Sequence, residues 1–182
     1  MSKKGKCVPE QTTISGELLQ IFGLGALIRG DSGIGKSESS LELIARGHKF
    51  ISDDVVLVRK TATGRLTGKS PSLSHNFMEI RGLGIINIKE IFGAKSILRQ
   101  APVDLIIRLK KWHRRREYDR LGLKFPEDIK ILGVGTPQLN IPVAPGRNIA
   151  TLIEVACKVH MLRLRGYHAS QEIMKKLERA LS

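Results

Sequence analysis

The clearest chemical pattern in this sequence is a glycine-rich run that ends in lysine and serine, at residues 30–37 (GDSGIGKS). The run matches G-x-x-x-x-G-K-[ST] at every fixed position, with Lys36 and Ser37 as its last two residues. In such a loop the backbone N–H groups surround phosphate oxygens, the lysine reaches the β- and γ-phosphates, and the serine hydroxyl ligates Mg²⁺. An apolar stretch precedes the run and a helix-like stretch follows it, as the motif requires. The sequence therefore predicts a nucleotide or phosphate site formed by the whole loop: Gly30, Asp31, Ser32, Gly33, Ile34, Gly35, Lys36 and Ser37.

Carboxylates further along the chain are candidates for the remaining chemistry of such a site. Asp53 and Asp54 stand together after an apolar stretch, where a partner of Mg²⁺ or a catalytic base belongs. A simple Asp-Asp turn between two strands explains the same residues equally well. Glu79 lies between apolar neighbours, either as the exposed residue of an alternating strand or as a ligand.

The chain is strongly basic, with 31 Lys and Arg against 17 Asp and Glu and a formal net charge of +14. Such a charge fits nucleic acid, phosphate ligands, an acidic partner or a solvated basic face. Only 4% of the residues are aromatic, which argues against stacking on single-stranded nucleic acid. Basic residues concentrate in one segment, which composition assigns equally well to phosphate, nucleic acid or solvent: Arg108, Lys110, Lys111, Arg114, Arg115, Arg116 and Arg120.

Length and composition restrict the class of protein. A chain of 182 residues with 41% hydrophobic residues suits one globular domain, and we expect residues 1–13 to be a flexible lead-in to a domain over 14–182. The two cysteines form no CxxC pair, which excludes a disulfide scaffold and favours the reducing cytoplasm. No apolar run is long enough to span a bilayer, and the five histidines lack the spacing of a zinc site.

Hydrophobic periodicity and turn residues predict an α/β domain around a mixed sheet. The expected strands, the first two joined as a hairpin, are residues 17–22, 25–29, 49–52, 55–59, 85–88 and 103–109. The expected helices are residues 36–46, a helix after the N-cap Asn148 that stops at Gly166, and a last one from Ser170. We expect residues 61–74, rich in Gly, Ser, Thr and Lys, to form a mobile loop.

Four motifs together resemble the catalytic domain of bacterial HPr kinase/phosphorylase: residues 30–38, 47–54, 78–87 and 142–148. The resemblance runs from about Ile14 to the end of the chain. It implies ATP-dependent phosphorylation of a seryl hydroxyl of HPr, the small phosphocarrier of the sugar phosphotransferase system. It also implies the reverse reaction, in which inorganic phosphate removes the phosphoryl group as pyrophosphate. The implied fold is a P-loop domain with a core like that of phosphoenolpyruvate carboxykinases, with C-terminal helices over about residues 149–181, assembled as a homohexamer.

The same resemblance implies roles for individual residues. Lys36 and Ser37 match the nucleotide and Mg²⁺ residues, and Glu79 matches a second contact to Mg²⁺. Asp54 matches the acid/base, and Arg120 matches a catalytic arginine. The segment 142–147 matches a loop tied to dephosphorylation, and the C-terminal helices match those that contact HPr.

The sequence departs from this family at two points. Ser15 stands where the family usually has a histidine, and a serine carries no charge near neutral pH. Family members usually also have an N-terminal domain, which precedes the part that this chain resembles.

Two other functions fit the phosphate loop. A nucleic-acid-associated ATPase would use the positive charge along a nucleic-acid backbone and Asp53 or Asp54 to position water. A small-metabolite kinase would use the same loop with another acceptor. We expect the HPr kinase/phosphorylase, with no membrane and no nucleic acid as its partner.

Overall fold

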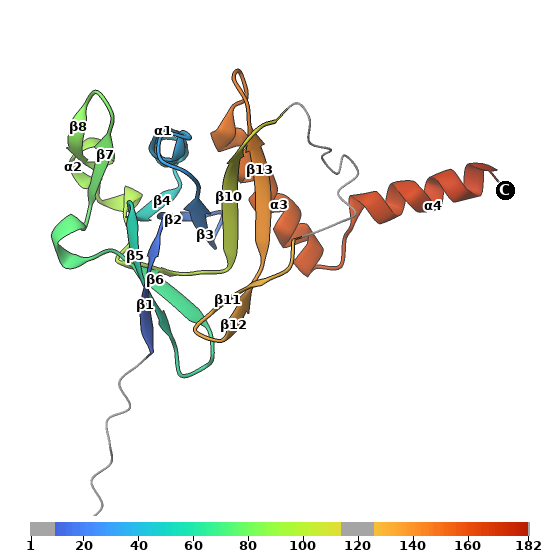
Figure 1. The fold of residues 1–182 in the computed structure, drawn as a ribbon, viewed down its shortest axis with the longest axis horizontal. Coiled ribbons are helices and arrows are strands. Elements are labelled where there is room, and N and C mark those ends of the chain that lie inside the picture. The colour runs from blue at the N-terminus through green and yellow to red at the C-terminus, as the bar shows by residue number, and fades with distance from the viewer. Residues whose placement is uncertain (1–9, 114–125, 182) are drawn as a thin grey trace, which may run out of the picture.

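A mixed β-sheet with strand order β13-β10-β3-β2-β4 forms the centre of the fold (Figure 1). The structure is a computed structural model that describes residues 10–113 and 126–181. The strands of this sheet are β2 (Glu17–Ile21), β3 (Leu24–Arg29), β4 (Lys49–Ser52), β10 (Leu105–Lys111) and β13 (Gln138–Val143). Strand β10 is parallel to both β3 and β13, whereas β2 is antiparallel to β3 and β4. The carboxyl ends of β3, β10 and β13 therefore lie at one edge of the sheet, where the phosphate loop begins.

A second, antiparallel sheet covers one face of the central sheet. Its order is β1-β5-β6-β9, formed by β1 (Gln11–Ser15), β5 (Val55–Lys60), β6 (Leu66–Lys69) and β9 (Gln100–Pro102). Leu18, Leu27 and Ile106 of the central sheet pack against Val56 and Val58 of the second sheet in one hydrophobic core. Neighbouring residues of a strand point to opposite faces, so the adjacent Leu19, Ile28 and Ile107 belong to another core.

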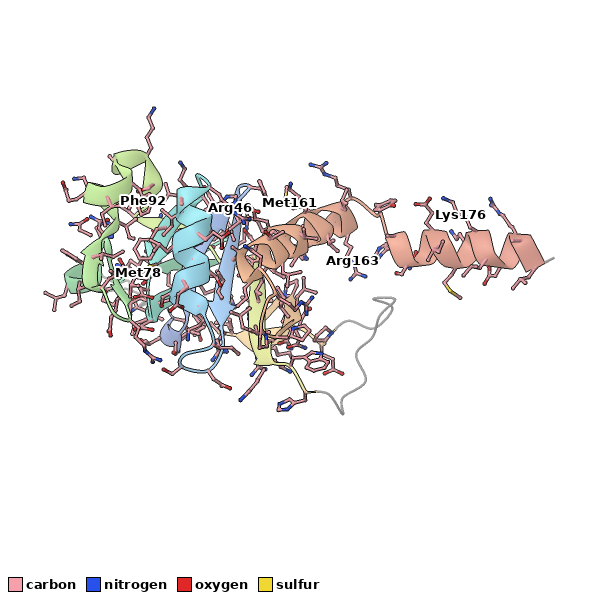
Figure 2. All side chains as sticks on the ribbon, turned by 90° about the horizontal axis from the view of Figure 1, so that it is seen from above. Arg46, Met78, Phe92, Met161, Arg163 and Lys176 are labelled. Carbon is pink, nitrogen blue, oxygen red and sulfur yellow. The ribbon has the colours of Figure 1, made fainter. Side chains whose placement is uncertain are left out.

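Two helices cover the other face of the central sheet. Helix α1 (Lys36–Ala45) follows the phosphate loop, and helix α3 (Ile149–Leu164) packs beside it (Figure 2). Both helices contribute to the core that contains Leu19, Ile28 and Ile107. Leu43 and Ile44 come from α1, and Ile153 and Cys157 come from α3. At their surface Arg46, which follows α1, forms ion pairs with Glu42 and Glu154, and the imidazole of His48 lies 2.8 Å from Glu154. These contacts connect the C-terminal end of α1 to α3.

Smaller elements complete the described part of the chain. They are the 3₁₀ helices η1 (Ser72–Ser74) and η2 (Ala94–Ser96), the hairpins β7 (Phe77–Ile80) with β8 (Gly84–Asn87) and β11 (Ile129–Ile131) with β12 (Val134–Thr136), and helix α2 (Ile88–Phe92). Helix α4 (Ala169–Leu181) extends away from the sheets (Figures 1 and 2), and none of its residues is buried. Among the described residues, no helix is long and apolar enough to cross a bilayer.

The predicted mixed α/β fold is confirmed, but several local predictions need correction. Strand β1 begins at Gln11, within the segment expected to be a flexible lead-in. Strand β6 lies within residues 61–74, which we expected to form a mobile loop, and it pairs with both β5 and β9. Residues 85–88 were expected as a buried strand, but Ile85 is 75% exposed and Ile88 already begins α2. The last helix begins at Ala169, one residue before Ser170.

Glu17 is the more deeply buried of two buried carboxylates among the described residues, the other being Asp53. Glu17 opens β2 with no exposed surface, on the same face as Leu19, and its carboxylate accepts a hydrogen bond from the Ser40 hydroxyl of α1. Burial raises the pKa of Glu17 from 4.5 to about 8, and the nearby charge of Asp53 adds to the rise. Hydrogen bonds from seryl hydroxyls and the charge of Lys36 lower this pKa but do not offset burial.

Glu17 makes folding pH-dependent. Its pKa is about 8 in the folded chain and 4.5 without burial, so between these pH values the folded chain keeps a proton that the unfolded chain releases. The free energy of unfolding therefore falls as pH rises through this range. Glu17→Gln removes the part of this pH dependence that is due to Glu17. We expect the variant to gain stability relative to the parent as pH rises, measured by urea denaturation with circular dichroism. Parallel stability curves for the two proteins would show that Glu17 binds no proton in the folded chain.

Asn148 caps helix α3, as predicted. Its side-chain oxygen accepts a hydrogen bond from the Thr151 N–H at 2.7 Å, and its Nδ2 donates to Glu42 at 2.9 Å. We expect Asn148→Ala to lower the free energy of unfolding by about 1 kcal/mol, because the cap is lost. Asn148→Ser keeps a capping oxygen but not the bond to Glu42, and it should lose less. If urea denaturation shows the same loss of unfolding free energy for both variants, the effect is due to the bond with Glu42 and not to the cap.

Candidate functional site

The phosphate loop, residues 30–37, connects the carboxyl end of β3 to the first turn of α1. Gly35 precedes α1 with a φ of +95°, a left-handed conformation that side chains other than glycine rarely adopt. Gly30 lies against β10, where an added Cβ would be 2.9 Å from the Leu109 carbonyl oxygen. The loop therefore needs glycine at both positions, and it presents the N-terminus of a ten-residue helix, which attracts anions.

The two polar residues that end the loop have different partners. Lys36 Nζ donates to the carbonyl oxygens of Gly30 and Asp31, at 3.1 and 3.2 Å, so its ammonium group lies over the loop. The Ser37 hydroxyl donates to a carboxylate oxygen of Glu17 at 3.0 Å. Glu17 is therefore part of this site, and sequence reasoning missed it. A charged residue at the start of an apolar strand was the signal that could have found it.

A cavity of about 200 Å³ brings together residues that are far apart in the sequence. It is lined by Ser32, Gly33, Gly35, Lys36, Ser37, Glu38, Asp54, Glu79 and Arg81. The phosphate loop thus meets the end of the β4–β5 turn at Asp54 and the β7–β8 hairpin at Glu79. Arg81, which was not predicted as a site residue, reaches toward the loop, because an added Cβ at Gly33 would lie 3.5 Å from its Nη1.

The two adjacent aspartates have different environments. Asp53 is buried, and its Oδ2 accepts the backbone N–H of Glu79 at 2.9 Å, which ties the hairpin to the β4–β5 turn. Burial raises the pKa of Asp53, and the charge of Asp54 contributes to the rise. Asp54 adopts a φ of +55° within the turn, and its side chain is exposed in the cavity. The pair therefore is a turn between two strands, and Asp54 is the member that can contact a ligand.

The cavity offers oxygen atoms suited to Mg²⁺. Ser37 contributes a hydroxyl and Glu79 a carboxylate, both hard ligands that this ion prefers. Within the part of the chain that is described, no three His, Cys, Asp or Glu residues form a cluster that could hold a metal ion. Mg²⁺ commonly binds through one or two protein groups together with substrate phosphates, so these residues fit it without such a cluster.

A second cavity of about 380 Å³ adjoins the start of the loop at Gly30 and Asp31. Ser15 lines it, and the Ser15 carbonyl oxygen accepts a hydrogen bond from Arg29 Nε at 3.1 Å. A permanent positive charge therefore lies beside Ser15. The other basic residues that line this cavity are Arg108, Lys110, Lys111 and His113.

Arg147, in the segment predicted to take part in dephosphorylation, hydrogen-bonds within its own turn. Arg147 Nη1 donates to the Pro142 carbonyl oxygen at 2.8 Å and so closes the turn over residues 142–147. Neither cavity is lined by Arg147. Arg120 lies outside the described residues.

Known proteins resemble this chain over most of its length. It is 46% identical over 167 residues to an HPr kinase/phosphorylase of Caldanaerobacter subterraneus subsp. tengcongensis, covering 92% of this chain and 54% of that protein. It is 48% identical over 166 residues to an HPr kinase/phosphorylase of Geobacter sulfurreducens, covering 91% and 52%. The chain thus spans about half the length of these relatives.

A solved structure has the same fold. The Hpr(Ser) kinase/phosphatase of Coxiella burnetii superposes with a TM-score of 0.79 at 37% sequence identity, over 89% of this chain and 98% of that chain. The sequence model of the HPr Serine kinase C-terminal domain matches residues 6–177, which include the phosphate loop, both aspartates and Glu79. This chain belongs to the HPr serine kinase C-terminal domain family.

Proposed function

We propose that this chain is the catalytic domain of a bifunctional HPr serine kinase/phosphorylase. It transfers the γ-phosphoryl group of ATP to a seryl hydroxyl of HPr or an HPr-like phosphocarrier, and it removes that group with inorganic phosphate to give pyrophosphate. The observation that carries this proposal is the single cavity that joins the phosphate loop to Asp54 and Glu79. The names of the two relatives and of the solved structure support the same activity.

In the proposed forward reaction, the loop N–H groups and Lys36 bind the phosphates of ATP. Mg²⁺, held by Ser37 and Glu79, would neutralise charge on the phosphate oxygens. Asp54 accepts the proton of the seryl hydroxyl as its oxygen attacks the γ-phosphorus and ADP leaves. The guanidinium of Arg81 lies near the loop, where it can stabilise negative charge on the transferring group. We also propose that the positive charge of Arg120 stabilises the transferring group.

In the reverse reaction, a phosphate oxygen attacks the phosphorus of phosphoserine. The bond to the seryl oxygen breaks, and pyrophosphate is the product. The leaving seryl oxygen needs a proton, which Asp54 donates from its protonated form, and the proton that the attacking hydrogen phosphate loses restores that form. Both directions therefore require the same carboxyl group at the same place.

The proposed protein partners are HPr and further copies of this chain, in a homohexamer in the cytoplasm. Helix α4 supports a protein contact, because it presents exposed apolar residues on an otherwise polar helix: Ile173, Met174, Leu177 and Leu181. We do not retain the nucleic-acid-associated ATPase. Family membership accounts for the phosphate loop, and phosphate ligands account for the basic cavity without a nucleic acid.

The function is tested by incubating the chain with ATP, Mg²⁺ and HPr and measuring the intact mass of HPr. We expect the mass of one phosphoryl group to appear on HPr and to be lost on addition of inorganic phosphate, with release of pyrophosphate. Lys36→Ala is the control, and it should remove both reactions while leaving the fold intact. Release of phosphate from ATP into water with unmodified HPr would contradict the proposal.

Asp54→Asn is the sharpest single test of the proposed mechanism. It keeps the shape of the side chain but can neither accept nor return a proton, so both reactions should slow by about a hundredfold or more. Initial rates in the two directions measure this, and nucleotide binding should persist because the loop is unchanged.

Asp53→Asn is the matched variant, because this side chain is buried and contacts the hairpin rather than the cavity. Its loss of rate should be smaller in both directions. A larger loss than that of Asp54→Asn would exchange the roles of the two residues. If Asp54→Asn keeps either reaction near the parental rate, the shared acid/base role is wrong.

A further inference from the structure

The direction of the Ser37 hydroxyl proton decides whether this residue can hold a cation. A seryl hydroxyl has one proton and two lone pairs, and only the lone pairs can ligate a metal ion. In the structure this proton is donated to Glu17 Oε1 at 3.0 Å. The hydroxyl thus donates its proton to a buried group of the protein. Its lone pairs remain available to a ligand in the cavity that Ser37 lines.

Glu17 is itself held in place by the fold. It has no exposed surface, and its backbone belongs to β2, which pairs with β3 on one side and β4 on the other. Its second oxygen accepts the hydroxyl proton of Ser40, one helical turn after Ser37 on α1. The carboxyl group is therefore fixed at both oxygens and cannot turn away from Ser37.

Packing of the apolar core does not explain a carboxyl group at this position. Leu19 and Ile21, on the same face of β2, are fully buried apolar residues of the core. An apolar side chain at position 17 would continue that core without the cost of removing a polar carboxyl group from water. What the carboxyl group adds is a contact with the buried Asp53 and an acceptor for two hydroxyls of α1, one of which lines the cavity.

We infer that Glu17 is a positioning residue for Mg²⁺, which fixes the Ser37 hydroxyl by accepting its proton so that the oxygen lone pairs are left for the ion. The inference rests on the proposed function, in which Ser37 is a ligand of Mg²⁺. It does not depend on the charge of Glu17, because a protonated carboxyl group still has an oxygen that accepts the Ser37 proton. Partners of metal ligands of this kind typically change metal affinity 10- to 100-fold when they are removed.

The test measures binding rather than catalysis. The affinity for adenylyl imidodiphosphate is measured by isothermal titration calorimetry with Mg²⁺ and again with EDTA, and the ratio of the two is the magnesium gain. Glu17→Met should reduce this gain about 10-fold or more, because it removes the acceptor. The affinity in EDTA should stay near that of the parent, since the loop backbone and Lys36 are unchanged. Glu17→Gln should retain most of the gain, because its amide oxygen can still accept the Ser37 proton.

Two further comparisons separate this role from simpler effects. In a Ser37→Ala background, Glu17→Met should cause no further loss, because Glu17 acts through the Ser37 hydroxyl. Glu17→Met also leaves the buried Ser40 hydroxyl without its acceptor, which can weaken folding. The measurement is therefore repeated with Glu17→Met/Ser40→Ala against Ser40→Ala alone, and circular dichroism checks the fold of each protein. Ser40→Ala by itself should keep the magnesium gain of the parent.

Each other outcome overturns the inference. A full magnesium gain in Glu17→Met would show that Ser37 needs no acceptor. An equal loss in Glu17→Gln and Glu17→Met would attribute the effect to charge, and a further loss in the Ser37→Ala background would mean that Glu17 acts on the ion without Ser37. A parent chain with no magnesium gain would overturn both the inference and the Mg²⁺ site of the proposed function. A parental gain with an unaffected Glu17→Met would overturn the inference alone.

Discussion

The position of the phosphate loop depends on strand β3, which is buried on both faces from Leu24 to Ile28. Hydrogen bonds to β2 and β10 fix its register, and the two hydrophobic cores on its faces fix its height between the second sheet and the helices. Gly25 allows this close packing, because an added Cβ would lie 1.7 Å from the Pro102 carbonyl oxygen. A loop that must aim successive N–H groups at phosphate oxygens needs such a rigid base, since small displacements weaken every hydrogen bond at once.

Four carboxylates from β2, the β4–β5 turn and β7 lie around this loop, and burial divides them into two kinds. Glu17 and Asp53 are buried and bind groups of the protein: the hydroxyls of α1 and the backbone of the β7–β8 hairpin. Asp54 and Glu79 line the cavity, where solvent and ligands reach them. The buried pair thus holds together the elements that carry the exposed pair. Two residues that are adjacent in the sequence can therefore have different roles: Asp53 binds the protein backbone and Asp54 faces the cavity.

The sequence was informative where the chemistry is local. A contiguous loop with a required glycine spacing, and an N-cap such as Asn148, depend on neighbouring residues, and both were located from their residues alone. The prediction that Glu79 belongs to the site came from a family resemblance. Periodicity alone left Glu79 either an exposed strand residue or a ligand. Glu17 and Arg81 were missed, because their proximity to the loop arises from strand pairing and hairpin placement across the fold. Strand β6 was missed because its residues have turn-like composition, and pairing on both edges overrides that preference.

Positive and negative groups lie close together around the loop. Lys36, Arg81 and the N-terminus of α1 present positive charge to the cavity, which suits a polyphosphate. Glu17 lies beneath this charge, and Lys36 lowers its pKa while burial raises it, so the carboxyl group is sensitive to the net charge above it. The Ser37 hydroxyl can donate to this carboxyl group whether or not the group carries a proton, because a protonated carboxyl group keeps one oxygen that only accepts. The geometry at Ser37 therefore persists when the charge in the cavity changes, which is what a site needs if it handles ATP in one direction and inorganic phosphate in the other.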